Sequence, residues 1–199
     1  MPKVKIDRKT LLKNSLSVFK EKGYAAASMS DLAAANGLLK GSMYHYVEGK
    51  EALMKEILIA LKDHYVDKVF SKAYDEDLSP VQRLKELASR AEEIFMHEEG
   101  GDFFVNIGLE TSKSNDAFAA IIRSFFAEWI KTLQHLYAFV LNGDDARVKA
   151  ETTVAEIEGA VILMRLLKDG NYLTRTNENL MKEYKELYSR QNQDTEIPY

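Results

Sequence analysis

The sequence predicts an all-α protein of about nine helices, with a three-helix head followed by a larger helical body. Apolar residues recur at helical spacing through most of the 199 residues, and no stretch alternates as a half-buried strand does. Helix-start and helix-stop residues, such as Pro80 and Asn142-Gly143, separate these periodic stretches. We therefore expect two domains, residues 5–65 and residues 66–199.

The first helix is expected from about Asp7 to Lys22, and Gly23 should end it because glycine readily leaves helical geometry. One of its faces carries an apolar stripe interrupted by one serine: Leu11, Leu12, Ser15, Leu16 and Phe19. This stripe predicts a scaffolding helix that covers the back of the two short helices that follow it.

Residues 28–50 predict two short helices joined by a tight turn. Ser28 is a good N-cap, and Asp31 can complete a capping box. Asn36-Gly37 should end the first short helix, and the second is expected from about Lys40 to Val47. This arrangement is a helix-turn-helix, whose second helix can enter the major groove of DNA.

The second short helix is rich in hydrogen-bond donors and flat rings, which suits DNA contact. Eight residues are expected to line the DNA face: Ser28, Lys40, Gly41, Ser42, Tyr44, His45, Tyr46 and Lys50. We assign both lysines and Tyr44 to phosphate, and Ser42, His45 and Tyr46 to base edges. The alternative is an ordinary amphipathic helix whose polar residues are merely solvated.

These residues carry a family resemblance. Residues 37–47, GLLKGSMYHYV, and residues 49–53, GKEAL, resemble the DNA-binding signature of TetR-type transcriptional regulators. The similarity extends upstream through KGY at 22–24 and SMSDLA at 28–33. Two positions depart from the family pattern: Leu39 replaces a small polar residue, and Val47 replaces phenylalanine. The resemblance implies a repressor that binds palindromic operator DNA as a homodimer and releases it on binding a small-molecule effector.

The body should contain five helices after a fourth helix from about Lys50 to Lys72. They are expected at Pro80–His97, Phe103–Leu109, Asp116–Leu141, Asp144–Lys168 and Asn177–Arg190, with Gly100-Gly101 as a break. The resemblance implies that the last two helices pair across the two-fold axis of the dimer. The small residues Ala155, Gly159 and Ala160 would let helices approach closely there.

The body is rich in aromatic residues, with a few polar residues on otherwise apolar helices. A filled core explains this pattern, and so does an apolar cavity between bundle helices. On the second interpretation a planar, mainly apolar effector contacts Phe103, Phe104, Asn106, Glu110, Phe125, Trp129, Met164 and Arg165. The sequence leaves both interpretations open.

Charge and composition limit the other function classes. The net charge of −4 divides into +5 for residues 1–50 and −9 for the rest, so the basic part can meet phosphate. The chain has no cysteine, no apolar run long enough to span a membrane and no signal-peptide core, so we expect a cytoplasmic protein. No catalytic set or metal-ligand motif appears, and we expect no cofactor and no enzyme activity. A helical small-molecule-binding protein with a degenerate DNA-binding head is the alternative function.

Overall fold

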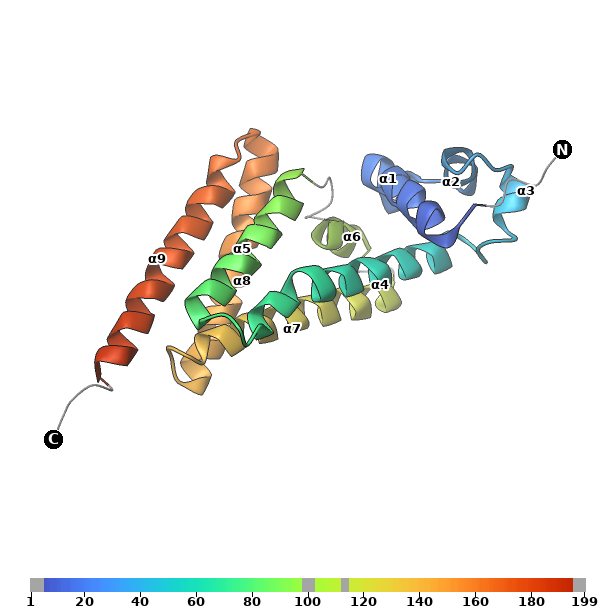
Figure 1. Ribbon diagram of the computed structural model, residues 1–199. Coiled ribbons are helices and arrows are strands. Elements are labelled where there is room, and N and C mark those ends of the chain that lie inside the picture. The colour runs from blue at the N-terminus through green and yellow to red at the C-terminus, as the bar shows by residue number, and fades with distance from the viewer. Residues whose placement is uncertain (1–5, 98–102, 112–114, 195–199) are drawn as a thin grey trace. The chain divides into compact units, whose positions relative to one another are not determined.

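The computed structural model describes residues 6–97, 103–111 and 115–194, and most of them are helical. These residues form nine α-helices and one 3-10 helix and contain no strand (Figure 1), so the all-α fold class is confirmed. The elements are α1 (Arg8–Ala26), α2 (Met29–Ala35), α3 (Lys40–Met43), α4 (Lys50–Lys68), η1 (Phe70–Tyr74), α5 (Pro80–His97), α6 (Phe103–Thr111), α7 (Asp116–Tyr137), α8 (Gly143–Leu167) and α9 (Asn171–Asp194). The expected break at Gly100-Gly101 lies outside the described residues.

The helices form two compact units. The first unit comprises Met1–Asp63 and Phe103–Arg123, and the second comprises His64–Asp102 and Ser124–Tyr199. The spatial grouping therefore differs from the division at residue 65 in one respect, because α6 and the start of α7 belong with the head. Helix α1 packs against both α2 and α6, which explains this grouping.

The first unit is built around the buried face of α1. Leu11 and Phe19 are buried there, as the apolar stripe predicts. The serine in this stripe is also buried, and its hydroxyl oxygen accepts a hydrogen bond from Asn36 Nδ2 at 3.1 Å. Gly37 has a φ of 64° and allows the chain to reverse after α2. These contacts fix the angle at which α3 leaves the turn.

Two helices of the first 80 residues end earlier than predicted. Helix α3 has one regular turn, because His45 N and Tyr46 N donate to the carbonyl oxygens three residues earlier rather than four. Helix α4 ends at Lys68 rather than near Lys72, and the buried Phe70 begins a 3-10 helix instead. Local periodicity could not predict either helix end, since both depend on how the residues after the helix pack into the core.

Two helices of the second unit also differ from their predicted bounds. Helix α7 ends at Tyr137 rather than Leu141. Phe139 N and Val140 N donate to the carbonyl oxygens three residues earlier, which is the pattern of a turn and not of an α-helix. Helix α9 begins at Asn171, six residues before the predicted Asn177, and buries Leu173 in its first turn. The Asp169 side chain accepts from Asn171 N at 3.0 Å and so supports this earlier start.

The second unit contains a cluster of aromatic side chains around the buried Trp129. The Trp129 ring lies with its centroid 6.0–6.3 Å from those of Phe70, Phe95, Phe125 and Phe126. Helix α9 packs against α5 and α8. Within the described residues, no helix is both long and apolar enough to cross a membrane.

Candidate nucleic-acid interface

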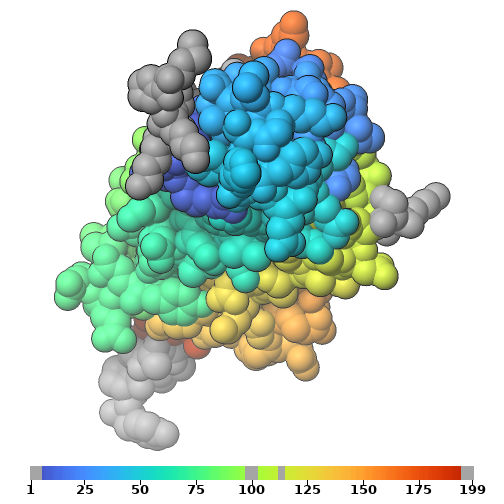
Figure 2. Space-filling model, turned by 90° about the vertical axis from the view of Figure 1, so that its right-hand side faces the viewer, coloured from blue at the N-terminus to red at the C-terminus, as the bar shows by residue number. Residues whose placement is uncertain are grey.

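Helix α3 and the turn after it have an apolar inner side and a polar outer side. Met43 is fully buried and Val47 is 6% exposed, so both lie on the inner side. The expected DNA-facing residues of this segment all retain some exposure: Lys40, Gly41, Ser42, Tyr44, His45 and Tyr46. The surface of α2 and α3, light blue to cyan, faces the viewer in Figure 2. The outer side of this segment therefore carries hydroxyls, an imidazole and an ammonium group.

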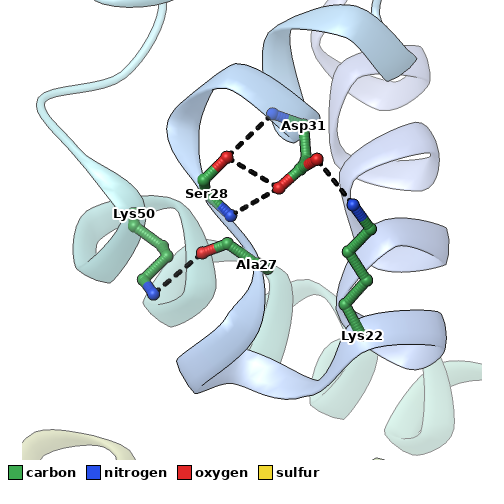
Figure 3. A network of polar contacts seen from close by, with 5 residues as sticks. All are labelled: Lys22, Ala27, Ser28, Asp31 and Lys50. Carbon is green, nitrogen blue, oxygen red and sulfur yellow. Dashed lines mark hydrogen bonds and ion pairs between the residues drawn. The ribbon is translucent and has the colours of Figure 1, made fainter.

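Ser28 uses its polar groups within the protein. Its hydroxyl donates to Asp31 Oδ2 at 2.6 Å and accepts from Asp31 N at 3.2 Å, while Ser28 N donates to Asp31 Oδ2 at 2.9 Å (Figure 3). This is the predicted capping box. Lys22 Nζ pairs with the other Asp31 oxygen at 2.6 Å. Hydrogen bonds from Lys22 and Ser28 hold the pKa of the Asp31 carboxyl well below its usual range. The start of α2 is therefore strongly fixed.

Lys50 reaches back from the start of α4 to the segment between α1 and α2. Its Nζ donates to the carbonyl oxygens of Tyr24, Ala25 and Ala27 at 2.8, 3.2 and 2.9 Å. The ammonium also lies 4.6 Å from the centre of the Tyr24 ring, at cation–π distance. Figure 3 shows the contact with Ala27 beside the capping box. An ammonium has three donors, so this geometry occupies all three.

Glu110 of α6 holds the same segment through its amide groups. Its carboxylate accepts from Tyr24 N at 2.9 Å and from Ala25 N at 2.6 Å. We call Lys50, Glu110 and the peptide groups of residues 24–27 the peptide clamp. Gly23 precedes the clamp with a φ of 76°, and an added Cβ would lie 3.3 Å from Glu110 Oε2. Glycine thus satisfies both the backbone angle and the close approach of the carboxylate.

Arg8 contributes to this interface through contacts within the protein that sequence reasoning did not identify. One guanidinium nitrogen donates to the carbonyl oxygen of Tyr46 at 2.6 Å, and two others bind the Glu56 carboxylate. We call α3 and the turn after it, residues 40–47, the recognition segment. Arg8 therefore ties the end of this segment to α1 and α4. Tyr46 and Glu56 follow Arg8 by 38 and 48 positions, so helical periodicity does not predict these contacts.

The eight residues predicted to contact an effector are divided between the two units. Phe103, Phe104, Asn106 and Glu110 belong to the first unit, whereas Phe125, Trp129, Met164 and Arg165 belong to the second. Three of the four in the second unit are buried, and Arg165 donates to the carbonyl oxygen of Phe95 at 2.7 Å. Among the described residues, no group of three or more His, Cys, Asp or Glu side chains is placed to hold a metal ion.

An exposed polar recognition segment, held on two supporting helices and followed by a separate helical unit, defines a helix-turn-helix DNA-binding protein. The family described as "Bacterial regulatory proteins, tetR family" matches residues 11–57. A second family, "Transcriptional regulator LmrA/YxaF-like, C-terminal domain", matches residues 80–179. The chain therefore belongs to the TetR family, and it is a DNA-binding transcriptional regulator.

Individual relatives agree with this assignment along most of the chain. The HTH-type transcriptional repressor DhaR of Mycobacterium sp. strain GP1 is 24% identical, over 80% of this chain and 82% of DhaR. The transcriptional regulator AcuR of Cereibacter sphaeroides is 28% identical, over 83% of this chain and 79% of AcuR. A TetR transcriptional regulator from Legionella pneumophila shares the fold with a TM-score of 0.79 at 15% identity, covering 91% of this chain and 98% of that one.

Proposed function

We propose that this regulator is a repressor that binds a palindromic operator as a homodimer and releases it when a small molecule binds its second unit. The observation that carries the proposal is the recognition segment, whose apolar side is anchored while its polar side is exposed. The name of DhaR, a repressor similar over four fifths of this chain, supports the same direction of regulation. The direct experiment is a gel shift with DNA from around the gene that encodes the protein.

On the DNA, we propose that Lys40 and Tyr44 bind phosphate and that Ser42, His45 and Tyr46 face base edges. Lys40 is exposed at the first position of α3, and Tyr44 is 50% exposed. A lysine suits phosphate as a point charge, whereas an imidazole and hydroxyls can hydrogen-bond to bases. We propose that Lys50 supports the same interface by holding residues 24–27 in place through its three hydrogen bonds to their carbonyl oxygens.

Replacing Lys40 with alanine is expected to weaken binding to all sequences alike. Each lost phosphate contact should lower the slope of log K against log salt by about 1 for each half-site. Gel shifts or fluorescence anisotropy over a series of salt concentrations measure the slope. Lys131→Ala is the matched control, because that side chain is 71% exposed on α7 in the second unit. An unchanged slope in Lys40→Ala would exclude the phosphate contact.

We propose that the homodimer forms through α8 and α9. Exposed apolar or small residues recur along one side of α8: Ala155, Gly159, Ile162, Leu163 and Leu166. Three of them, Ala155, Gly159 and Leu163, border a groove of about 420 Å³ between α8 and α9, whose lining also includes Tyr172 and Leu180. An apolar stripe of this kind usually marks a protein–protein contact. A two-fold dimer would place two recognition helices about 34–36 Å apart, one turn of DNA.

For the effector, we propose a planar apolar molecule that carries a hydrogen-bond acceptor and binds the second unit near Trp129. Trp129 is 2% exposed, yet within the described residues its indole N–H has no hydrogen-bond partner. The same is true of Arg165 Nε, and both side chains lie against Phe95. Two buried donors without acceptors favour a ligand oxygen at this place. These two donors distinguish the aromatic cluster from an ordinary apolar core.

Matched pairs of aromatic compounds test this effector proposal. We expect 2-naphthoate to bind and release operator DNA about tenfold more effectively than naphthalene, because its carboxylate accepts hydrogen bonds from the buried donors. Trp129→Phe keeps an aromatic ring but removes the donor, so this preference should shrink. Calorimetry and operator release are the measurements. Equal responses to both compounds in the wild type would contradict the acceptor.

Release of DNA also requires the effector to prefer one arrangement of the protein. A difference of about 1–3 kcal/mol between its affinities for the free and DNA-bound forms changes operator affinity 5–150-fold. Selection from a pool of random duplexes tests sequence reading by the head directly, because a head that reads no sequence would enrich none.

A further inference from the structure

Leu39 is the most exposed large apolar side chain in the described part of the chain. It is 80% exposed, whereas its neighbour Leu38 is partly covered. Leu39 occupies the N-cap position of α3, where its side chain makes no capping hydrogen bond. Its carbonyl oxygen instead accepts from Ser42 N at 2.9 Å and Met43 N at 3.1 Å. The backbone is thereby anchored while the isobutyl group extends into solvent.

The surroundings of Leu39 are those of a groove-reading surface. It directly precedes Lys40 and Gly41, both exposed, at the start of the recognition helix. In helix-turn-helix proteins the first residues of this helix meet base edges in the major groove. Leucine can neither donate nor accept a hydrogen bond, so it cannot read the polar pattern of a base. The apolar feature that the major groove offers is the 5-methyl group of thymine.

We propose that Leu39 reads a thymine methyl group, so that each operator half-site carries an A·T pair of fixed orientation opposite the start of α3. The contact removes leucine and methyl surface from water together, which favours thymine over cytosine and over thymine on the opposite strand. This inference rests on the DNA-binding function. It adds one position of sequence specificity carried by a residue that forms no hydrogen bond to the base.

The test removes the methyl group without altering any hydrogen bond of the base. The wild-type protein first selects its operator from a pool of random duplexes. Each thymine of the selected half-site is then replaced in turn by deoxyuridine. We expect one position to lose about fourfold in affinity, and about fifteenfold when both half-sites carry the change, as burial of a methyl group predicts.

A double-mutant cycle assigns that loss to Leu39. Leu39→Ala should bind the deoxyuridine and thymine operators with nearly equal affinity, because the partner of the methyl group is gone. Leu109→Ala is the matched control: this leucine is 75% exposed on α6, and its variant should keep the wild-type preference. Leu39→Ala should also fold normally, since the side chain is solvent-exposed.

Three results would overturn the inference. They are a selected half-site in which no deoxyuridine substitution weakens binding, a Leu39→Ala variant that retains the full thymine preference, and a Leu109→Ala variant that loses it equally. The first two leave the regulator function intact, because a defined operator has been selected. If the pool enriches no sequence at all, the DNA-binding function itself fails.

Discussion

Lys50→Met is expected to lower operator affinity by at least tenfold while leaving the salt slope unchanged. The substitution keeps the length of the side chain but removes the donors to three carbonyl oxygens of residues 24–27. Hydrogen bonds from a charged group are worth more than neutral ones, so we expect a loss of about 2 kcal/mol in the free energy of unfolding. The start of α2 would lose its support, and the recognition segment would no longer be held in one position.

The salt series separates this positioning role from the phosphate contact that the sequence suggests. A lysine that binds phosphate releases counterions, so its loss would lower the slope by about 1 for each half-site. Lys55→Met is the control, because Lys55 lies on α4 and pairs with Glu51, one helical turn away, at 2.7 Å. A Lys50→Met variant with unchanged melting temperature and a reduced slope would contradict the positioning role and support the phosphate contact.

Glu110→Gln completes this experiment because charge and geometry predict opposite effects. Removing a negative charge from a DNA-binding protein should strengthen its attraction to phosphate. The amide, however, has one acceptor oxygen where the carboxylate has two for Tyr24 N and Ala25 N. A fall in operator affinity would therefore show that the peptide clamp dominates. A rise would show that Glu110 acts on the DNA only through its charge.

Features that depend on residues close together in the sequence could be predicted, whereas features that depend on distant residues could not. The capping box of Ser28 and Asp31 and the turn at Gly37 depend on residues within a few positions, and the sequence predicts both correctly. Met43 and Val47 lie four positions apart and are both buried, which agrees with helical spacing. Local pattern thus accounts for the fold class and for most of the helix-turn-helix.

The contacts that position the interface could not be predicted in this way. Glu110 bonds to amides 85 and 86 residues away, and Arg8 reaches Glu56 across 48 residues. Nothing in either local sequence identifies the partner, because the pairing arises only when the helices pack. The motif predicts that Lys50 belongs to the DNA interface, but only the structure reveals its three carbonyl partners.

Gly159→Arg is expected to produce a monomer at micromolar concentration and to reduce operator affinity about a hundredfold or more. Within the described residues, a Cβ added at Gly159 would meet no atom within 4 Å, so the substitution does not disturb the protomer. Gly159 is nevertheless one of the residues that border the groove between α8 and α9. In a dimer that buries this groove, a long cation at the small-residue position would prevent close approach of the helices.

The loss of DNA binding would follow from the loss of the second half-site. A dimer binds its second half-site at a high effective concentration, whereas a monomer must bind each one separately. Helix propensity favours arginine over glycine by up to about 1 kcal/mol, so any loss of function would not come from a weakened α8.

Ala127→Arg, at an exposed site on α7 of the second unit, is the matched control for an added charge. Sedimentation velocity and gel shifts measure assembly and binding. A Gly159→Arg protein that sediments as a dimer and keeps its operator affinity would place the two-fold interface elsewhere.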